Sequence, residues 1–124
     1  MDVGKLDINT LKSDFSKYKK SLLQLNEYMY KNPELGYQEV KSVDKITKLI
    51  QKFVIDAKFK KFNEIPTAFT ASFNKRTSKK DIAICIEYDA LPNVGHACGH
   101  NLISSIGLGA FFILSNYKKD LDYE

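Results

Sequence analysis

The residues with the greatest capacity for chemistry lie together between positions 87 and 101. This segment reads Glu87-Tyr88-Asp89-Ala90-Leu91-Pro92-Asn93-Val94-Gly95-His96-Ala97-Cys98-Gly99-His100-Asn101. It holds both histidines of the chain, one of the two cysteines and two carboxylates. An apolar stretch typical of a strand, residues 82–86, precedes it. A loop with these groups, between a strand and a helix, is well suited to bind a metal ion.

Cys98 and His100 are the best candidates for metal ligands in this loop. Zinc and related ions bind thiolate and neutral imidazole well. Gly99, between them, permits a loop backbone in which both side chains turn toward one point. The start of the following helix favours the thiolate form of Cys98. Asp89 would either bind the metal or accept a hydrogen bond from a ligand histidine.

Other interpretations of the same residues remain open. Glu87 and His96 could also bind metal or support a ligand. A Cys–His nucleophilic pair would need a bent loop, and no third partner or oxyanion hole is recognisable. Cys-x-His pairs also occur by chance, and buried cysteines are common. Cys85, inside the predicted strand, is interpreted as a core residue, and a Cys85–Cys98 disulfide is disfavoured in a chain that is not exported.

Length and charge limit the class of protein. The 124 residues suffice for one domain. The net charge of +4 comes from lysines and one arginine that are scattered among acids. No nucleic-acid motif accompanies them, so we predict solvated surfaces, with at most a mild preference for anionic partners. No apolar run is long enough for a bilayer and residues 1–7 lack a signal core, which predicts a cytoplasmic protein without a membrane partner.

The helices are predicted from the spacing of apolar residues. Residues 9–31 form one amphipathic helix, which Asn9 or Thr10 would cap and Pro33 would limit. Its stripe consists of Leu11, Phe15, Tyr18, Leu22, Leu25 and Met29. This stripe could form a dimeric coiled coil, but packing on a sheet is the more common use. A second helix spans about residues 38–55, with Val43, Ile46, Ile50 and Phe53 on its buried face.

The remaining elements predict an α/β fold. Strands are expected at about residues 57–62 and 67–73, then a basic loop at 74–80 and a central strand at 81–87, apolar on both faces. A last helix, about 99–117, is apolar almost all round, and Gly107 and Gly109 would let it approach a strand closely. We therefore predict an incomplete layered domain with a mixed β-sheet flanked by helices.

Three motifs, in order, resemble the aminoacylase/carboxypeptidase family of metallohydrolases. They are Asn32-Pro33-Glu34-Leu35-Gly36-Tyr37-Gln38-Glu39, Pro66-Thr67-Ala68-Phe69, and the segment 87–101 described above. The resemblance covers roughly residues 12–117 and is closest to the amidohydrolase branch that includes aminobenzoyl-glutamate hydrolases and aminoacylase-like β-alanyl-lysine dipeptidases. It implies hydrolysis of the amide bond of N-acyl amino acids or small dipeptides at a centre of two divalent metals, zinc or manganese.

The resemblance also assigns roles to single residues. It implies that Cys98 and His100 are metal ligands and that Asp89 orients the site. Where the wider family has a ligand histidine two residues before this aspartate, the chain has Glu87, which puts a direct ligand role for Glu87 in doubt. His96 matches a position that is not a ligand. Tyr30 stands where the family often has a histidine.

The resemblance implies that residues 1–124 are the N-terminal portion of a catalytic domain. The family's general-base glutamate pair, its later metal ligands and its lid or dimerisation domain have no counterpart in this sequence, so we expect no activity from the 124 residues alone. Alternatives are a non-enzymatic remnant or split-enzyme subunit that acts through a complementary chain, self-association through an open sheet edge, and a small zinc or redox module.

Overall fold

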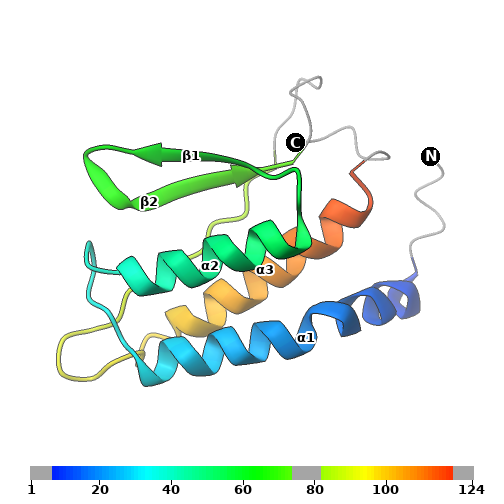
Figure 1. Cartoon of the computed structure of the whole chain (residues 1–124). Coiled ribbons are helices and arrows are strands. Elements are labelled where there is room, and N and C mark those ends of the chain that lie inside the picture. Colours follow the sequence, from blue (N-terminus) through cyan, green and yellow to red (C-terminus); the bar gives the residue numbers. More distant parts are fainter. Residues whose placement is uncertain (1–6, 74–81, 119–124) are drawn as a thin grey trace.

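The three-dimensional structure is a computed structural model, which describes residues 7–73 and 82–118. Within these residues it contains three helices and a two-stranded antiparallel sheet. The elements are α1 (Ile8–Lys31), α2 (Val40–Phe53), β1 (Lys58–Phe62), β2 (Ile65–Ser72) and α3 (His100–Asn116). The three helices pack around a common core, and the hairpin lies above α2 in the view of Figure 1. This confirms a partial α/β domain, while the predicted basic loop at 74–80 falls outside the described residues.

Helix α1 presents the predicted apolar stripe to the core. Four of its members are buried, namely Tyr18, Leu22, Leu25 and Met29, while Phe15 near the start remains 36% exposed. The predicted cap is wrong by two or three positions, because the helix begins earlier. The Oδ1 atom of Asp7 accepts the backbone N–H groups of Asn9 at 2.7 Å and Thr10 at 2.8 Å. A carboxylate here satisfies the free N–H groups of the first turn.

The core forms where the three helices meet. The rings of Tyr18, Phe53 and Phe112 come from α1, α2 and α3, and their centroids lie 5.0–5.4 Å apart. Aromatic rings at such distances bury large apolar areas and add favourable edge contacts. The Tyr18 hydroxyl donates to the Oδ1 atom of Asn116 at 2.7 Å, which satisfies the polar end of that ring.

Polar contacts also join α1 to α3 along their lengths. The Tyr117 hydroxyl donates to Asp14 at 2.6 Å, and the Asn101 amide donates to the side-chain oxygen of Asn26 at 2.9 Å. Each bond connects residues that are far apart in the sequence. The antiparallel packing of these two helices is therefore fixed at both ends.

Glu34, in the preceding turn, caps the start of helix α2. Its carboxylate accepts the backbone N–H groups of Lys41 at 2.9 Å and Ser42 at 2.7 Å, and also the Ser42 hydroxyl at 2.7 Å. These bonds satisfy donors that a helix start leaves free. The carbonyl of Glu34 accepts the N–H of Ala90 at 2.8 Å. The same residue therefore connects the start of α2 to the segment that carries the candidate site.

The hairpin follows the predicted alternation. Strand β1 pairs with β2 in antiparallel register from Lys58 opposite Ser72, with an irregularity between Lys61 and Phe62. Thr67 and Phe73 are buried, and the intervening residues of the same parity, Phe69 and Ala71, are partly buried. The predicted parity is confirmed.

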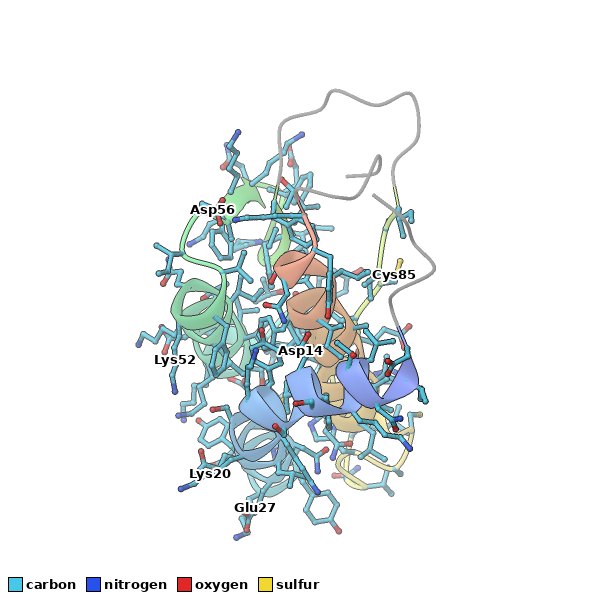
Figure 2. All side chains as sticks on the ribbon, turned by 90° about the vertical axis from the view of Figure 1, so that its right-hand side faces the viewer. Asp14, Lys20, Glu27, Lys52, Asp56 and Cys85 are labelled. Carbon is cyan, nitrogen blue, oxygen red and sulfur yellow. The ribbon has the colours of Figure 1, made fainter. Side chains whose placement is uncertain are left out.

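The prediction of a covered central strand at 81–87 is wrong for the residues that the structure describes, 82–87. They are extended but belong to no sheet, and residues 82–85 are exposed. The interpretation of Cys85 as a core residue is wrong as well, since its side chain points outward (Figure 2). Apolar side chains on both faces of this segment indicate that, as a strand, it would need other elements to cover both faces. In the described residues, α3 covers only one side.

Gly107 allows α3 to lie directly on this extended segment. A Cβ atom at Gly107 would stand 2.5 Å from Cγ2 of Ile86 and 3.3 Å from Cγ2 of Ile84. Gly109 faces α1 instead, where a Cβ atom would stand 3.2 Å from the tips of Leu22 and Phe15. The predicted close approach to a strand-like segment is confirmed for Gly107 only.

We expect Gly107→Ala to destabilise the fold relative to Gly109→Ala by about 1–2 kcal/mol. Both substitutions gain the same helix propensity, so their difference reports packing. At position 107 the new methyl group meets Cγ2 of Ile86, which is fixed next to the backbone, whereas at 109 it meets the movable end of Leu22. Urea unfolding monitored by circular dichroism measures both. Equal midpoints would contradict the close contact between α3 and residues 84–86.

We expect Glu34→Gln to lower the free energy of unfolding by about 1–2 kcal/mol at neutral pH. Burial opposes ionisation of Glu34, but the hydrogen bonds from Lys41 and Ser42 outweigh it and lower the pKa below the ordinary 4.5. A lowered carboxylate pKa stabilises the fold above that ordinary value, and this stabilisation is lost as the pH falls through the lowered pKa. The difference between the two proteins should therefore shrink in acid.

The control for this experiment is Glu27→Gln, whose carboxylate contacts Lys31 on the surface of α1. An exposed pair contributes little, so this variant should stay within about 0.5 kcal/mol of the parent. If Glu34→Gln behaved like the control at every pH, the capping role of Glu34 would be refuted.

Candidate metal centre

The segment before α3 is shaped by a tight turn and by its contact with the turn before α2. Leu35 and Ala90 form an isolated parallel bridge. The backbone groups of Leu91 and Gly95 then bond to each other in both directions, at 2.9 and 3.2 Å. Asn93 and Gly95 have φ values of 65°, a region that asparagine and glycine adopt more readily than other residues. This turn returns the chain toward Asp89.

Gly99 sets the direction of α3. It has a left-handed φ of 78° and precedes the first helical residue, His100. Its carbonyl accepts the N–H groups of Leu102 at 2.9 Å and Ile103 at 3.0 Å. The helix therefore starts abruptly after the loop, and the His100 side chain is placed beside the end of the extended segment.

His100 lies between two carboxylates. Its Nδ1 atom is 2.8 Å from Oδ1 of Asp89 and 3.0 Å from the Asp89 carbonyl oxygen, while Nε2 is 3.3 Å from Oε2 of Glu87. The ring is largely buried, with 19% of the side chain exposed. Two oxygens at Nδ1 favour the tautomer in which Nδ1–H donates to Asp89. That tautomer leaves the Nε2 lone pair available for a metal.

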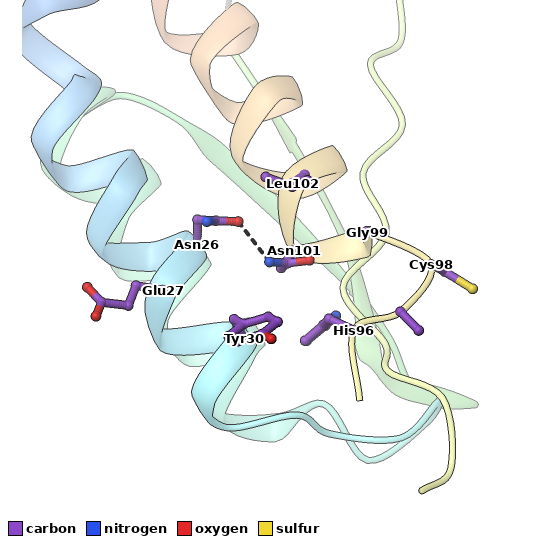
Figure 3. Close-up of a pocket in the computed structure, with 9 residues that line it drawn as sticks. Asn26, Glu27, Tyr30, His96, Cys98, Gly99, Asn101 and Leu102 are labelled. Atoms are coloured by element: carbon purple, nitrogen blue, oxygen red, sulfur yellow. Dashed lines mark hydrogen bonds between the residues drawn. The ribbon is translucent and has the colours of Figure 1, made fainter. Parts of the chain in front are cut away.

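The donor atoms at Nε2 partly fit a metal ion. Two ligand atoms of a tetrahedral zinc ion lie about 3.3–3.4 Å apart, and the Nε2–Oε2 separation of 3.3 Å agrees with this spacing. Cys98, however, is exposed, and its sulfur points away from His96 (Figure 3). Among residues 7–73 and 82–118, no group of three or more potential ligands gathers at one point. The roles of Asp89, Cys98 and His100 therefore stay predictions.

His96 occupies a different environment from His100. It is 7% exposed, and neither ring nitrogen makes a hydrogen bond within the described part of the chain. Burial lowers the pKa of His96 and the nearby His100 adds to this effect, while the Asp89 carboxylate opposes it. The His96 ring is therefore buried against the end of α1.

An open cavity of about 550 Å³ lies beside His96, between α1 and the start of α3. Its lining includes Asn26, Tyr30, Asn101 and Leu102, and the bond between the two asparagines closes one side (Figure 3). Asp89, Glu87 and His100 do not line it. The carboxylate–histidine group therefore lies outside the cavity, whereas the candidate ligand Cys98 lines it.

Sequence reasoning missed Tyr88, which fastens the site to the hairpin. Its hydroxyl donates to the carbonyl of Thr67 at 2.5 Å, and its ring stacks on Phe69 with centroids 6.3 Å apart. Burial, followed by the nearby carboxylates of Glu39 and Asp89, raises the pKa of Tyr88 to about 12. The shared parity of Tyr88 with Ile84 and Ile86 was the one available signal that its side chain faces inward.

Ser104 is a second residue that sequence reasoning missed. It is fully buried in α3, and its hydroxyl donates to the carbonyl of Glu87 at 2.6 Å. This bond ties α3 to the extended segment immediately before Asp89. Its position among apolar residues of α3 was the sequence signal for it.

Comparison with known proteins shows which proteins this chain resembles. No protein-family model matches the chain. A Xaa-Arg dipeptidase from Mus musculus is 33% identical over 97 residues, which is 69% of this chain and 22% of that protein. An N-acetyldiaminopimelate deacetylase from Oenococcus oeni is 32% identical over 113 residues, 79% of this chain and 29% of that protein. The chain thus spans less than a third of the length of the curated relatives it matches.

Together with the motifs, these similarities place the chain in the aminoacylase/carboxypeptidase family of peptidases and amidohydrolases. The human Xaa-Arg dipeptidase, 33% identical over 97 residues, and an N-acetyldiaminopimelate deacetylase from Lactobacillus helveticus, 29% identical over 115 residues, agree with this assignment. The resemblance inferred from the three motifs is confirmed.

We expect the neutral ring of His100 to carry its proton on Nδ1, and Asp89→Ala to increase the share of the tautomer that carries it on Nε2. The substitution removes the closer of the two acceptors at Nδ1 and leaves the backbone carbonyl of residue 89, while the Glu87 carboxylate still faces Nε2. Long-range ¹⁵N correlation spectra at alkaline pH distinguish the two tautomers. Glu87→Gln serves as the control and should leave the proton on Nδ1. A proton on Nε2 in the unmodified chain would contradict the orienting role of Asp89.

Proposed function

We propose that this chain forms part of a metal-dependent amidohydrolase that cleaves the amide bond of N-acyl amino acids or small dipeptides. The observation that carries the proposal is the carboxylate–histidine pair of Asp89 and His100, set within the family's motif. Two names among the relatives, a dipeptidase and an N-acetyl deacetylase, support this substrate class. Both names describe cleavage of an amide bond.

In this proposal Cys98 and His100 bind the divalent metal, zinc or manganese. A bound metal of this kind polarises the scissile carbonyl and lowers the pKa of water. Asp89 holds the proton on Nδ1 of His100, which leaves the lone pair of Nε2 free to bind the metal. Glu87 places a carboxylate oxygen beside Nε2. Cys98 contributes a thiolate from the exposed end of the loop.

The proposal assigns proton transfer to residues outside these 124. Activation of a water molecule requires a carboxylate beside it as general base. Asp89 and Glu87 both face His100 and are committed to that ring. The sequence contains no consecutive glutamate pair of the kind that the family resemblance implies. We therefore propose that the 124 residues alone do not catalyse hydrolysis.

The second candidate is a subunit or remnant that acts through a complementary chain supplying the missing ligands and base. The half-formed donor set around His100 favours this candidate over a self-contained zinc or redox module. The exposed free thiols of Cys85 and Cys98 support a reducing compartment such as the cytoplasm for either candidate.

Hydrolysis assays on the purified chain test the first part of the proposal. With zinc or manganese present, release of amino acid from N-acetyl amino acids or from Xaa-Arg dipeptides, followed by mass spectrometry, should stay at background. Turnover that disappears with chelator and with Cys98→Ser would show that the chain is a complete catalyst.

Metal titration tests the ligands independently of activity. We expect weak zinc binding by calorimetry, weakened on the order of 10-fold or more by Cys98→Ser and by His100→Ala, because each removes a donor. Cys85→Ser is the matched control and should bind zinc like the parent, since it removes an exposed thiol outside the loop. Binding unchanged in both ligand variants would refute the proposed centre.

A further inference from the structure

Lysines that are scattered in the sequence gather on one side of α2. Four of them follow one another at intervals of four, three and four residues, namely Lys41, Lys45, Lys48 and Lys52. The geometry of an α-helix then places them within a sector of about 60° and along about 17 Å of its axis. All four are exposed. We define these four residues as the lysine row.

Few acids neutralise the lysine row. Helix α2 contains a single acid, Asp44, which forms an ion pair with Lys48 at 2.8 Å. The Glu34 carboxylate lies near Lys41, but it accepts the backbone N–H groups of the helix start and the Ser42 hydroxyl. Within the described part of the chain, the three remaining lysines of the row form no ion pair. The row therefore presents several ammonium groups to the solvent.

Helix α1 broadens the basic surface. The Nζ atom of Lys45 lies 4.1 Å from the ring centroid of Tyr28, so the row borders α1. Lys20 of α1 and Lys52 of α2 point toward the same side of the molecule (Figure 2). Helix α1 carries five lysines and two acids, and α2 carries four lysines and one acid. The two helices therefore have a larger positive charge than the whole chain, whose net charge is +4.

The lysine row is expected to stay exposed in a longer protein as well. The chain spans less than a third of the length of its curated relatives, and further residues of such a protein would pack on apolar surfaces of this domain. Lysine is almost never fully buried unless it is paired, because removing an ammonium group from water is costly. The row is therefore poorly suited to being covered by the same chain, and a partner that covers it has to supply negative charge.

The surroundings of the row fit an anionic phospholipid surface better than a nucleic acid. Four or more lysines on an amphipathic helix are typical of helices that bind anionic lipid headgroups. Arginine, which recognises nucleic acids with a bidentate fork, is absent from α1 and α2. Large apolar side chains near the two ends of the row are exposed, namely Tyr37 at 77%, Val40 at 67% and Ile55 at 91%. Such side chains can enter the boundary between headgroups and acyl chains.

We propose that the lysine row of α2, together with the adjoining surface of α1, binds the anionic headgroups of a phospholipid membrane. No helix in the described part of the chain is long and apolar enough to cross a bilayer, and a surface contact requires none. The proposal departs from the prediction, made from the lack of a spanning segment, that the chain has no membrane partner. It is independent of the proposed hydrolase function, because it uses no residue of the segment 87–101.

Co-sedimentation of the chain with lipid vesicles tests this proposal. Each lysine near an anionic surface strengthens binding about fivefold, so the row should favour vesicles that contain phosphatidylserine over pure phosphatidylcholine by on the order of several hundred-fold. Because salt screens exposed charges, binding should weaken as the ionic strength rises. Equal binding to both kinds of vesicle, or no binding to either, would overturn the proposal.

A triple variant shows whether the row itself is the binding surface. It combines Lys41→Gln, Lys48→Gln and Lys52→Gln. Binding to the anionic vesicles should weaken on the order of 100-fold, because three charges are lost while glutamine keeps the helix propensity of lysine. Circular dichroism checks that the variant folds.

The matched control removes the same charge from exposed positions outside the row. It replaces with glutamine Lys12, Lys19 and Lys61. The first two lie on the side of α1 opposite Tyr28, away from α2. This variant should lose less than about fivefold in binding to the anionic vesicles. Equal losses in the two triple variants would show that binding follows net charge alone, which contradicts the proposal.

Fluorescence anisotropy with a single-stranded RNA oligonucleotide tests the alternative polyanion. At the same ionic strength, the chain should bind the RNA more weakly than the anionic vesicles. Tighter binding of the RNA, abolished by the triple variant of the row, would assign this surface to nucleic acid and overturn the proposal of a membrane contact.

Discussion

The close approach of α3 to residues 84–86 is the constraint on which the rest of the structure depends. It is possible because Gly107 has no side chain at the point of contact. The Ser104 hydroxyl strengthens the same contact by donating to the Glu87 carbonyl. With the helix fixed against the segment, its first residue, His100, necessarily lies beside Glu87 and Asp89. The geometry of the candidate site thus follows from packing several residues away.

The turn before α2 serves the same end through a different set of bonds. The Glu34 carboxylate holds the start of α2, while its carbonyl holds Ala90, the residue after Asp89. From the other side, Tyr88 bonds and stacks onto β2. All three motifs that carried the family resemblance therefore meet around Asp89. The motifs at residues 32–39 and 66–69 contribute no atom that bonds to His100. Their role in this structure is to position the segment 87–101.

The sequence allowed the local structure to be predicted and left the pairing of distant parts undetermined. The α1 stripe and the parity of Thr67 and Phe73 were visible because a buried face imposes a period on the chain. The partners of residues 82–87 could not be predicted in this way. Apolar side chains on both parities indicate that a segment needs cover on both faces, but they do not identify the elements that provide it. The cap at Asp7 was missed because several polar residues stand near the helix start.

The candidate site was predictable to a similar degree. The residue types in the loop predicted that Asp89 would bind the metal or accept a hydrogen bond from a ligand histidine. The structure brings Asp89 and His100 within hydrogen-bonding distance. The sequence could not show whether the Cys98 side chain turns toward His100 and Asp89, because a loop that contains glycine permits several directions. The contribution of Tyr88 depends on a strand that lies far earlier in the sequence, so no local pattern revealed it.

The pairing of α1 with α3 also has a consequence for the order in which the chain can fold. The bonds from Tyr18 to Asn116 and from Asp14 to Tyr117 span 98 and 103 residues. A contact between such distant positions stabilises the fold only after a long loop has closed, and closing that loop has an entropic cost. During synthesis on a ribosome, the apolar stripe of α1 is made first but finds its main partner only after α3 has emerged. For most of that interval the stripe is open to chaperones.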